Sequence, residues 1–463
     1  MHSDPIAPVI FGVTLILVAA LIGRFTARHL NQPSVLGELL MGIVLGNVLY
    51  LFHYDLMVVL REGTAVMDIA RHALAGVSLD EAATMVLGNY YGPIFLEVVK
   101  GARGGEYLQV AQAVDIFSRY GVIFLLFHVG LDTCVAELRE VGSNSLKVAI
   151  IGVLAPFVLG FLVAWALMPG VGHAEHMFLG ATLCATSIGI TARVLDDIGQ
   201  SASKEAHIIL GAAVIDDVLG LVILAIATGI VVTGSVELSQ VAGIITLSAF
   251  FIFSLLLMGP AIIKLLIRLL RNLNVMEAKL FISFIFVMTV AWLANTVGLA
   301  TIVGAFAAGL LLQDSHFNAW GDHRHHKYSI KELFAPLEAI LVPVFFVLMG
   351  IQVKLETFMD WHVIMLALGL IVVGIGGKIV SGLGADRHHN RLAIGVGMMP
   401  RGEVGLVFAS IGKSLGVMDS AMFSAVVLMI VVTTLSTPPI LTKYMGRGDP
   451  NAVSGPRHRR PCE

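Results

Sequence analysis

Charged residues are scarce in this sequence of 463 residues. Asp, Glu, Lys and Arg together make up 13% of it, whereas hydrophobic residues make up 57%. Soluble globular domains carry roughly 25% charged residues, so the composition excludes that class and predicts an integral membrane protein. The formal net charge of −3 leaves no basic excess for binding nucleic acid.

Cysteine is nearly absent as well. Cys134, Cys184 and Cys462 have neither metal-ligand spacing nor the even number of a disulfide framework. We therefore expect no disulfide, no zinc site and no cofactor. No nucleophile–base pattern of a membrane enzyme is visible either, so we do not expect an enzyme. The apolar run from Pro8 to Gly23 is followed by no small-residue cleavage site, and we interpret it as the first membrane helix.

Long apolar runs, in contrast, are plentiful. A spanning helix needs about 20 mostly apolar residues. Thirteen segments are predicted as spans on this basis: 6–27, 34–52, 116–135, 146–168, 176–197, 206–232, 241–268, 277–297, 299–314, 335–353, 362–383, 391–413 and 420–442. The predicted fold is therefore an all-α transmembrane domain over residues 1–442, followed by a short tail at 443–463.

Basic residues are distributed unequally between the predicted loops. If the N-terminus lies outside, the short outward loops hold only Lys354 and Lys413, whereas every inward loop holds two or more Lys or Arg residues. Basic residues collect on the cytoplasmic side of membrane proteins. We therefore predict a plasma (inner) membrane protein with its N-terminus outside and its C-terminal tail in the cytoplasm.

The two halves of the chain resemble each other in three short stretches. The matched pairs are "SVLGELLMGIVLG" (34–46) with "TIVGAFAAGLLLQ" (301–313), "FLLFHVGLD" (124–132) with "VFFVLMGIQ" (344–352), and "SIGITA" (187–192) with "EVGLVF" (403–408). The matched spans lie seven helices apart, an odd number, so the halves have opposite orientations in the membrane. Inverted repeats are typical of secondary transporters, whose sites lie near the midplane on interrupted helices.

The repeats define the expected organisation of the chain. Repeat one covers about 6–232, a linking helix covers 241–268, and repeat two covers about 277–442. The first half carries about 47 additional residues, which we place in an extracytoplasmic insertion at 51–115. Its mixture of charged and apolar residues predicts amphipathic helices at the membrane surface.

Two aspartates stand side by side in the apolar stretch "GAAVIDDVLGLVIL". A charged side chain at the bilayer centre costs several kcal/mol, and ionisable residues there are functional candidates. Asp216 and Asp217 point about 100° apart on a helix, so they face different surroundings. Lys378 lies at comparable depth in "GIGGKIVSG" and is the expected ion-pair partner of one of them.

Two spans carry polar or helix-breaking residues at equivalent positions in the repeats. In "LCATSIGITARVL", hydroxyl groups surround Gly189, and in "GMMPRGEVGLVF", Pro400 removes a backbone donor. Broken helices expose carbonyl groups that ligate cations and helix ends that need compensating charges. Thr186 and Ser187 are candidate ligands, with hydroxyls bonded to the preceding turn as the alternative. Arg401 and Glu403 are expected to neutralise helix ends or each other.

A histidine-rich stretch, "HFNAWGDHRHHKY", lies in a predicted inward loop from His316 to Tyr328. We expect a solvated loop there rather than a metal site. Because histidine titrates near neutral pH, pH sensing by the His316–His326 segment stays open.

The motifs "ATSIGITARVLDDIG", "GAAVIDDVLGLVIL" and "PRGEVGLV", in this order, resemble the bacterial monovalent cation:proton antiporters. The resemblance is to the sodium/proton branch with a paired aspartate, and it covers about 13–444 apart from 51–115. It implies a core domain with two crossed, broken helices and a dimerisation domain, which move against each other in alternating access. It also implies a homodimer in the lipid bilayer.

The resemblance also implies roles for individual residues. Asp217 binds the cation or a proton, Asp216 pairs with Lys378, and Thr186 occupies the polar position on the first broken helix. Potassium-efflux relatives usually have a Gln-Asp pair and a soluble regulatory domain, whereas this chain has Asp-Asp and ends about 20 residues after its last span. Na⁺ is therefore the expected cation, with Li⁺ or K⁺, and hence a potassium/proton antiporter, as the alternatives.

A physical argument supports exchange. Burial favours the neutral form of a lone carboxylate, which is then satisfied by a proton or by a cation but not by both. If a cation at Asp217 also draws Asp216 away from Lys378, the lysine releases a second proton and the cycle is electrogenic. A channel is the alternative from another class, although the filter or charged ring that it needs is not visible; a sensor with the same fold is another.

Overall fold

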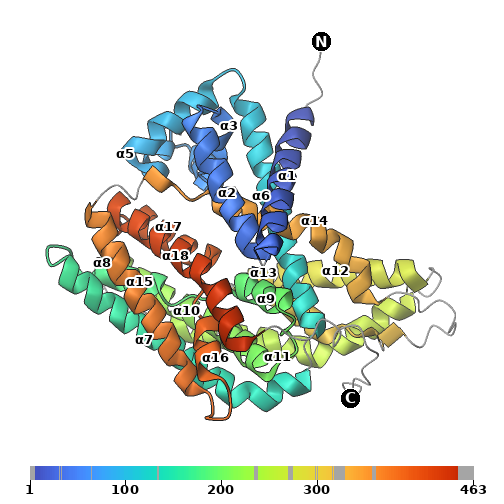
Figure 1. Ribbon diagram of the computed structural model, residues 1–463. Helices are drawn as coiled ribbons and strands as arrows, with labels where there is room; N and C mark the ends of the chain where they lie inside the picture. Colours follow the sequence, from blue (N-terminus) through green and yellow to red (C-terminus); the bar gives the residue numbers. More distant parts are fainter. Residues whose placement is uncertain are drawn as a thin grey trace.

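The computed structural model describes residues 6–30, 32, 34–63, 65–132, 135–233, 238–269, 275–297, 299, 301–314, 316–317, 329–356 and 361–446. Within these ranges all regular secondary structure is helical, which confirms the all-α prediction (Figure 1). The helices are α1 (Ala7–His29), α2 (Ser34–Leu51), α3 (Asp55–Leu60), α4 (Ala65–Leu74), α5 (Leu79–Lys100), α6 (Gly104–Asp132), α7 (Val135–Leu167), α8 (His173–Thr182), α9 (Ile188–Asp197), α10 (Lys204–Thr233), α11 (Leu238–Leu269), α12 (Val275–Thr296), α13 (Thr301–Leu311), α14 (Ile330–Ile351), α15 (Trp361–Ser381), α16 (Arg391–Gly397), α17 (Glu403–Ser414) and α18 (Ser420–Met445).

The number of membrane crossings follows only in part from helix length. In the described ranges, nine helices are long and apolar enough to cross a membrane, and α11, which bends by 41°, is a tenth. The other three predicted spans correspond to the short apolar helix α13 and to the interrupted pairs α8–α9 and α16–α17. The total of thirteen is therefore not confirmed by length and composition, and the orientation of the termini stays a prediction.

The helices associate in two groups. Helices α1, α2, α6, α12, α13 and α14 pack on one another, together with α3–α5, and we call them the scaffold group. Helices α7–α10 and α15–α18 form a second group, the core group, which gathers on one side of Figure 1. The groups meet where α9 packs on α2 and α6, where α18 reaches α2, and where α17 reaches α5, while α11 connects α10 to α12 and α13.

Close glycine contacts in the scaffold group follow the predicted repeat. A Cβ atom on Gly42 would lie 2.2 Å from the carbonyl oxygen of Val347, so α2 and α14 touch backbone to backbone. A Cβ atom on Gly309 would lie 2.1 Å from the carbonyl oxygen of Phe127, so α13 and α6 touch in the same way. The repeat aligns Gly42 with Gly309 and Val347 with Phe127, and these contacts are therefore equivalent. Small residues at such positions let membrane helices approach closely.

The 51–115 segment is more deeply packed than the sequence suggested. It forms α3, α4, α5 and the beginning of α6, which starts at Gly104, well before the predicted span at 116–135. Met57, Phe95 and Val110 from this segment are buried in one apolar cluster with Ile16 of α1 and Val344 of α14. Helices α3 and α5 thus extend the scaffold group's own core, while the position of the segment at a membrane surface stays a prediction.

Ion pairs reinforce this attachment. Arg61 pairs with Glu356 at 2.6 Å, and Lys354 pairs with Glu62 at 2.8 Å, so the segment is tied to the loop that follows α14. Burial lowers the pKa of Lys354, and the Glu62 carboxylate opposes that shift. Asn47 of α2 donates to the carbonyl oxygen of Val353 in the same loop at 2.8 Å.

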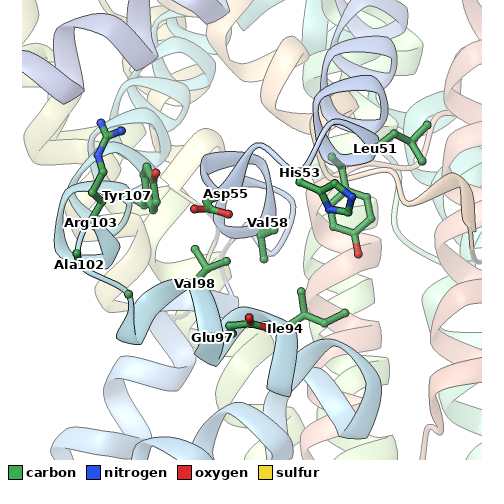
Figure 2. A pocket seen from close by; sticks show the side chains of 12 residues that line it. Leu51, His53, Asp55, Val58, Ile94, Glu97, Val98, Ala102, Arg103 and Tyr107 are labelled. Carbon is green, nitrogen blue, oxygen red and sulfur yellow. The ribbon is translucent and has the colours of Figure 1, made fainter.

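A cavity of about 790 Å³ lies between the end of α2, α3, α5 and the beginning of α6. Figure 2 shows Arg103 and Tyr107 on one side of it, Glu97 of α5 on another, and Asp55 between them. None of the side chains predicted to carry function lines this cavity. The candidate site therefore lies elsewhere, in the core group.

Candidate functional site

Two interrupted helices cross in the core group. Helix α8 ends at Thr182 and α9 begins at Ile188, while α16 ends at Gly397 and α17 begins at Glu403. The backbone N–H of Ser187 in the first break donates to the carbonyl oxygen of Pro400 in the second at 2.8 Å. The prediction of two broken helices that meet is thus confirmed.

Side chains satisfy the carbonyl groups that the breaks expose. On one side, Thr186 Oγ1 donates to the Met398 carbonyl at 3.1 Å, and Thr191 Oγ1 donates to the Gly397 carbonyl at 2.7 Å. Buried carbonyl groups need such partners. Thr186 and Thr191 of the first broken helix therefore bond to the second one, and for Thr186 this replaces the alternative expectation of a bond to its own preceding turn.

Two buried cationic side chains donate hydrogen bonds to the carbonyl groups of the first break. Lys378 Nζ donates to the Cys184 carbonyl at 2.7 Å, and Arg401 Nη1 donates to the Ala185 carbonyl at 2.8 Å. Both carbonyls follow the C-terminal end of α8, where the helix dipole is negative and a cation is favourable. This placement fits the expected role of Arg401 at a helix end.

Asp216 of α10 and Lys378 of α15 form an ion pair at 3.1 Å. Both side chains are completely buried. Removing one partner of such a pair leaves an uncompensated buried charge, which costs about 3–5 kcal/mol. The structure thus brings together the aspartate and the lysine that the sequence placed at similar depth.

Asp217 occupies a different face of α10, because consecutive helical residues point about 100° apart. Its side chain is also buried, with 6% of the residue exposed. Ser187, in the first break, is buried as well, and its Oγ makes no hydrogen bond within the described ranges. A Cβ atom on Gly402 would lie 2.5 Å from that Oγ, so glycine at 402 leaves room for the hydroxyl.

Two further predicted residues lie in the first turns of the helices that follow the breaks. Gly189 lies in the first turn of α9, and a Cβ atom there would meet its nearest neighbour, Val122 Cγ1, at an ordinary 3.7 Å. No close approach therefore requires glycine at 189. Glu403 begins α17, but its side chain lies outside what the structure describes, as does the loop at 318–328 with most of the predicted histidine cluster.

Thr434 is a supporting residue that the sequence analysis missed. Its Oγ1 donates to the Arg401 carbonyl in the second break, and its side chain is buried in α18. The sequence does contain a signal, because four hydroxyl side chains occur in the apolar stretch "VVTTLST". Nothing in the sequence indicates, however, that α18 lies beside the crossing.

The comparison with known families decides which kind of protein has this site. A model of the family described as "Sodium/hydrogen exchanger, transmembrane" matches residues 81–443. The chain belongs to this sodium/hydrogen exchanger family. Members of the sodium/hydrogen exchanger family are transporters, so the chain is a transporter and not an enzyme.

Three known proteins are similar to this chain over most of its length. It is 34% identical to the high-affinity Na⁺/H⁺ antiporter NhaS3 of Synechocystis over 94% of this chain and 89% of that protein. It is 30% identical to the Na⁺/H⁺-K⁺ antiporter GerN of Bacillus cereus, over 95% and 97% of the two chains. The exchanger fold is similar to the sodium proton antiporter MjNhaP1 of Methanocaldococcus jannaschii, with a TM-score of 0.59 and 16% identity over 96% and 98% of the chains.

Proposed function

We propose that this chain exchanges Na⁺ for protons across the plasma membrane by alternating access. The observation that carries the proposal is the buried pair of adjacent aspartates beside two crossed, broken helices, with one aspartate bound to Lys378. The names of two relatives, NhaS3 and GerN, include Na⁺/H⁺ antiport. A homodimer is part of the proposal, since the resemblance implies one.

Asp217 is the shared ligand of the cation and the proton in this proposal. Ser187, whose buried hydroxyl has no hydrogen bond in the described structure, is the second oxygen ligand offered by the crossing. Thr186 is already bonded to the Met398 carbonyl, so it positions the break and contributes a lone pair. A carboxylate that takes either a proton or Na⁺ couples the two fluxes without any covalent step.

Asp216 and Lys378 supply the second titratable unit. Their ion pair has no exposed surface, so the loss of either partner leaves the other as an uncompensated buried charge. When Na⁺ draws Asp216 into its ligand shell, Lys378 loses that partner and releases a proton. Two protons then move per Na⁺, and the cycle is electrogenic.

The two helix groups provide the parts that move. The site residues belong to α9, α10, α15 and the breaks, all within the core group, whereas the scaffold group contacts the core through only a few helices. Movement of the core group against the scaffold group would expose the site to one side at a time. With the predicted orientation, the 51–115 segment lies outside and the tail lies in the cytoplasm.

Potassium/proton exchange is the second candidate. The observation that favours it is the 30% identity to GerN, which is named as a Na⁺/H⁺-K⁺ antiporter. The buried oxygen ligands described above do not separate Na⁺, Li⁺ and K⁺ by charge, so selectivity depends on the size of the ligand shell.

The test is proton movement in proteoliposomes when each cation is added in turn. We expect Na⁺ to release a preformed proton gradient in the wild type, and Asp217→Asn to abolish this response while the protein stays folded. Asp80→Asn, which alters an exposed ion pair with Lys100, is the matched control and should behave like the wild type. Cation-dependent proton movement retained by folded Asp217→Asn protein, or a wild-type response to K⁺ alone, would contradict the proposal.

A further inference from the structure

A second polar cluster joins the two helix groups away from the aspartate pair. It consists of Arg193 and Asp197 on α9 of the core group, and Ser34 of α2, His128 of α6 and Glu338 of α14 in the scaffold group. We call these five residues the α9 latch. Exchange chemistry at Asp217 uses none of them.

The first part of the latch is a helix cap that crosses between the groups. Asp197 Oδ2 accepts hydrogen bonds from Ser34 N and Ser34 Oγ, both at 2.7 Å, and from Val35 N at 3.4 Å. The first N–H groups of a helix have no partner inside it, and a carboxylate there is favourable. The beginning of scaffold helix α2 therefore depends on a side chain from the core group.

The second part is an ion pair with a shared carboxylate. Arg193 Nη1 lies 3.1 Å from Glu338 Oε1, and its Nη2 donates to Ser34 Oγ at 3.3 Å. His128 Nδ1 bonds to the other oxygen of Glu338. His128 thus positions Glu338 to receive Arg193 from the opposite group.

The latch is largely removed from solvent. The side chains of Arg193, Asp197 and Glu338 are 11%, 13% and 8% exposed. A buried cluster of several bonds is either fully formed or fully open, because a partly broken cluster would leave buried charges without compensation. This is the property that a conformational switch needs.

The latch also lies at a contact between the core group and the scaffold group, which has to open if the two groups move against each other. Helix α9 begins at the break and ends at Asp197, so the latch closes the face between the crossing and the C-terminal end of α9. We propose that the α9 latch holds the core group against the scaffold group on this face and opens as a unit in each transport cycle. The role in transport rests on the proposed function, whereas the latch itself is testable without transport.

Hydrogen exchange at the beginning of α2 reports the latch directly. The amide protons of Ser34 and Val35 bond to Asp197 across the groups, so their exchange with deuterium requires the latch to open. Glu338→Gln removes the ion pair without touching either amide. We expect it to raise the exchange rate of these two amides in reconstituted protein by about tenfold, the change that 1.4 kcal/mol produces.

Glu62→Gln is the matched control, because it makes the same substitution in a buried ion pair, with Lys354, that lies within the scaffold group. Unchanged exchange at Ser34 and Val35 in the control, with faster exchange in Glu338→Gln, supports the latch. No change in Glu338→Gln, or an equal rise in both variants, overturns it. If Glu338→Gln does not fold, Arg193→Gln removes the other partner of the same pair and is judged in the same way. Failure of Na⁺ exchange with a positive amide result would refute the proposed function and leave the latch standing.

Discussion

The ion pair between Asp216 and Lys378 makes a quantitative prediction about charge movement. Lys378 Nζ donates to both carboxylate oxygens of Asp216, at 3.1 and 3.2 Å, and to the Cys184 carbonyl at 2.7 Å. Lys378→Gln keeps a polar group at this position but removes the positive charge and the proton that the lysine can release. If that proton is the second one in the cycle, the variant exchanges one proton for one cation and moves no net charge.

The size of the effect follows from one elementary charge. Moving one charge across 100 mV is worth about 2.3 kcal/mol. Because 1.4 kcal/mol corresponds to a factor of ten, 100 mV should shift the wild-type Na⁺ gradient at which proton flux reverses by about 50-fold. In Lys378→Gln the shift should disappear.

The assay is the reversal of proton flux in proteoliposomes whose membrane potential is set by potassium and valinomycin. Lys354→Gln is the matched control, since Lys354 is also a buried lysine in an ion pair, but it lies in the loop after α14. It should retain the wild-type voltage response. A wild type whose reversal gradient ignores voltage, or a Lys378→Gln variant that responds like the wild type, would refute the reasoning and return the pair to a purely structural role.

Two further predictions concern the scaffold group and the orientation of the chain. Gly42→Val should lower the thermal unfolding temperature and reduce the folded yield, because even a Cβ atom would lie 2.2 Å from a backbone carbonyl and overpacking costs about 1–3 kcal/mol. Gly105→Val, where the described structure has no atom within 4 Å of the added Cβ, is the control, and an equal loss in both variants would count against the close contact. In a background without the native cysteines, Ala102→Cys should react with an impermeant maleimide added to intact cells, and Arg387→Cys only after permeabilisation. The reverse pattern would show that the predicted orientation is wrong.

Local patterns in the sequence predicted the elements and the charged pair. Apolar runs indicate helices in a membrane, Pro400 and its neighbouring glycines indicate a break, and the few ionisable residues at mid-depth leave little choice of partner. For this reason an ion pair between Lys378 and one of the two aspartates could be predicted from residue types and depth, whereas the choice of Asp216 came from the family resemblance. The repeat even related the contact at Gly42 to the one at Gly309.

Contacts between distant parts of the chain were not predictable in the same way. Arg193 and Glu338 lie 145 positions apart, and each is an ordinary charged residue within a helix. Thr434 supports the second break only because α18 packs beside it. The early start of α6 at Gly104 was missed because polar residues such as Gln109 and Gln112 interrupt the apolar pattern there, and the pattern does not show that Val110 is buried in the scaffold group. These features depend on which helices pack beside one another, and the hydrophobic periodicity of the sequence does not show that.

Competition between Na⁺ and protons at Asp217 is the central claim, and proton release on binding tests it most directly. Calorimetric titration of the purified protein with Na⁺ in two buffers of different ionisation enthalpy gives the number of protons released per cation bound. We expect about two protons per Na⁺ in the wild type, one from the Asp217 carboxyl, whose neutral form is favoured by burial, and one from Lys378 when Asp216 leaves the ion pair. We expect no Na⁺ binding in Asp217→Asn. Na⁺ binding that releases no proton, or binding that survives in Asp217→Asn, would contradict the account.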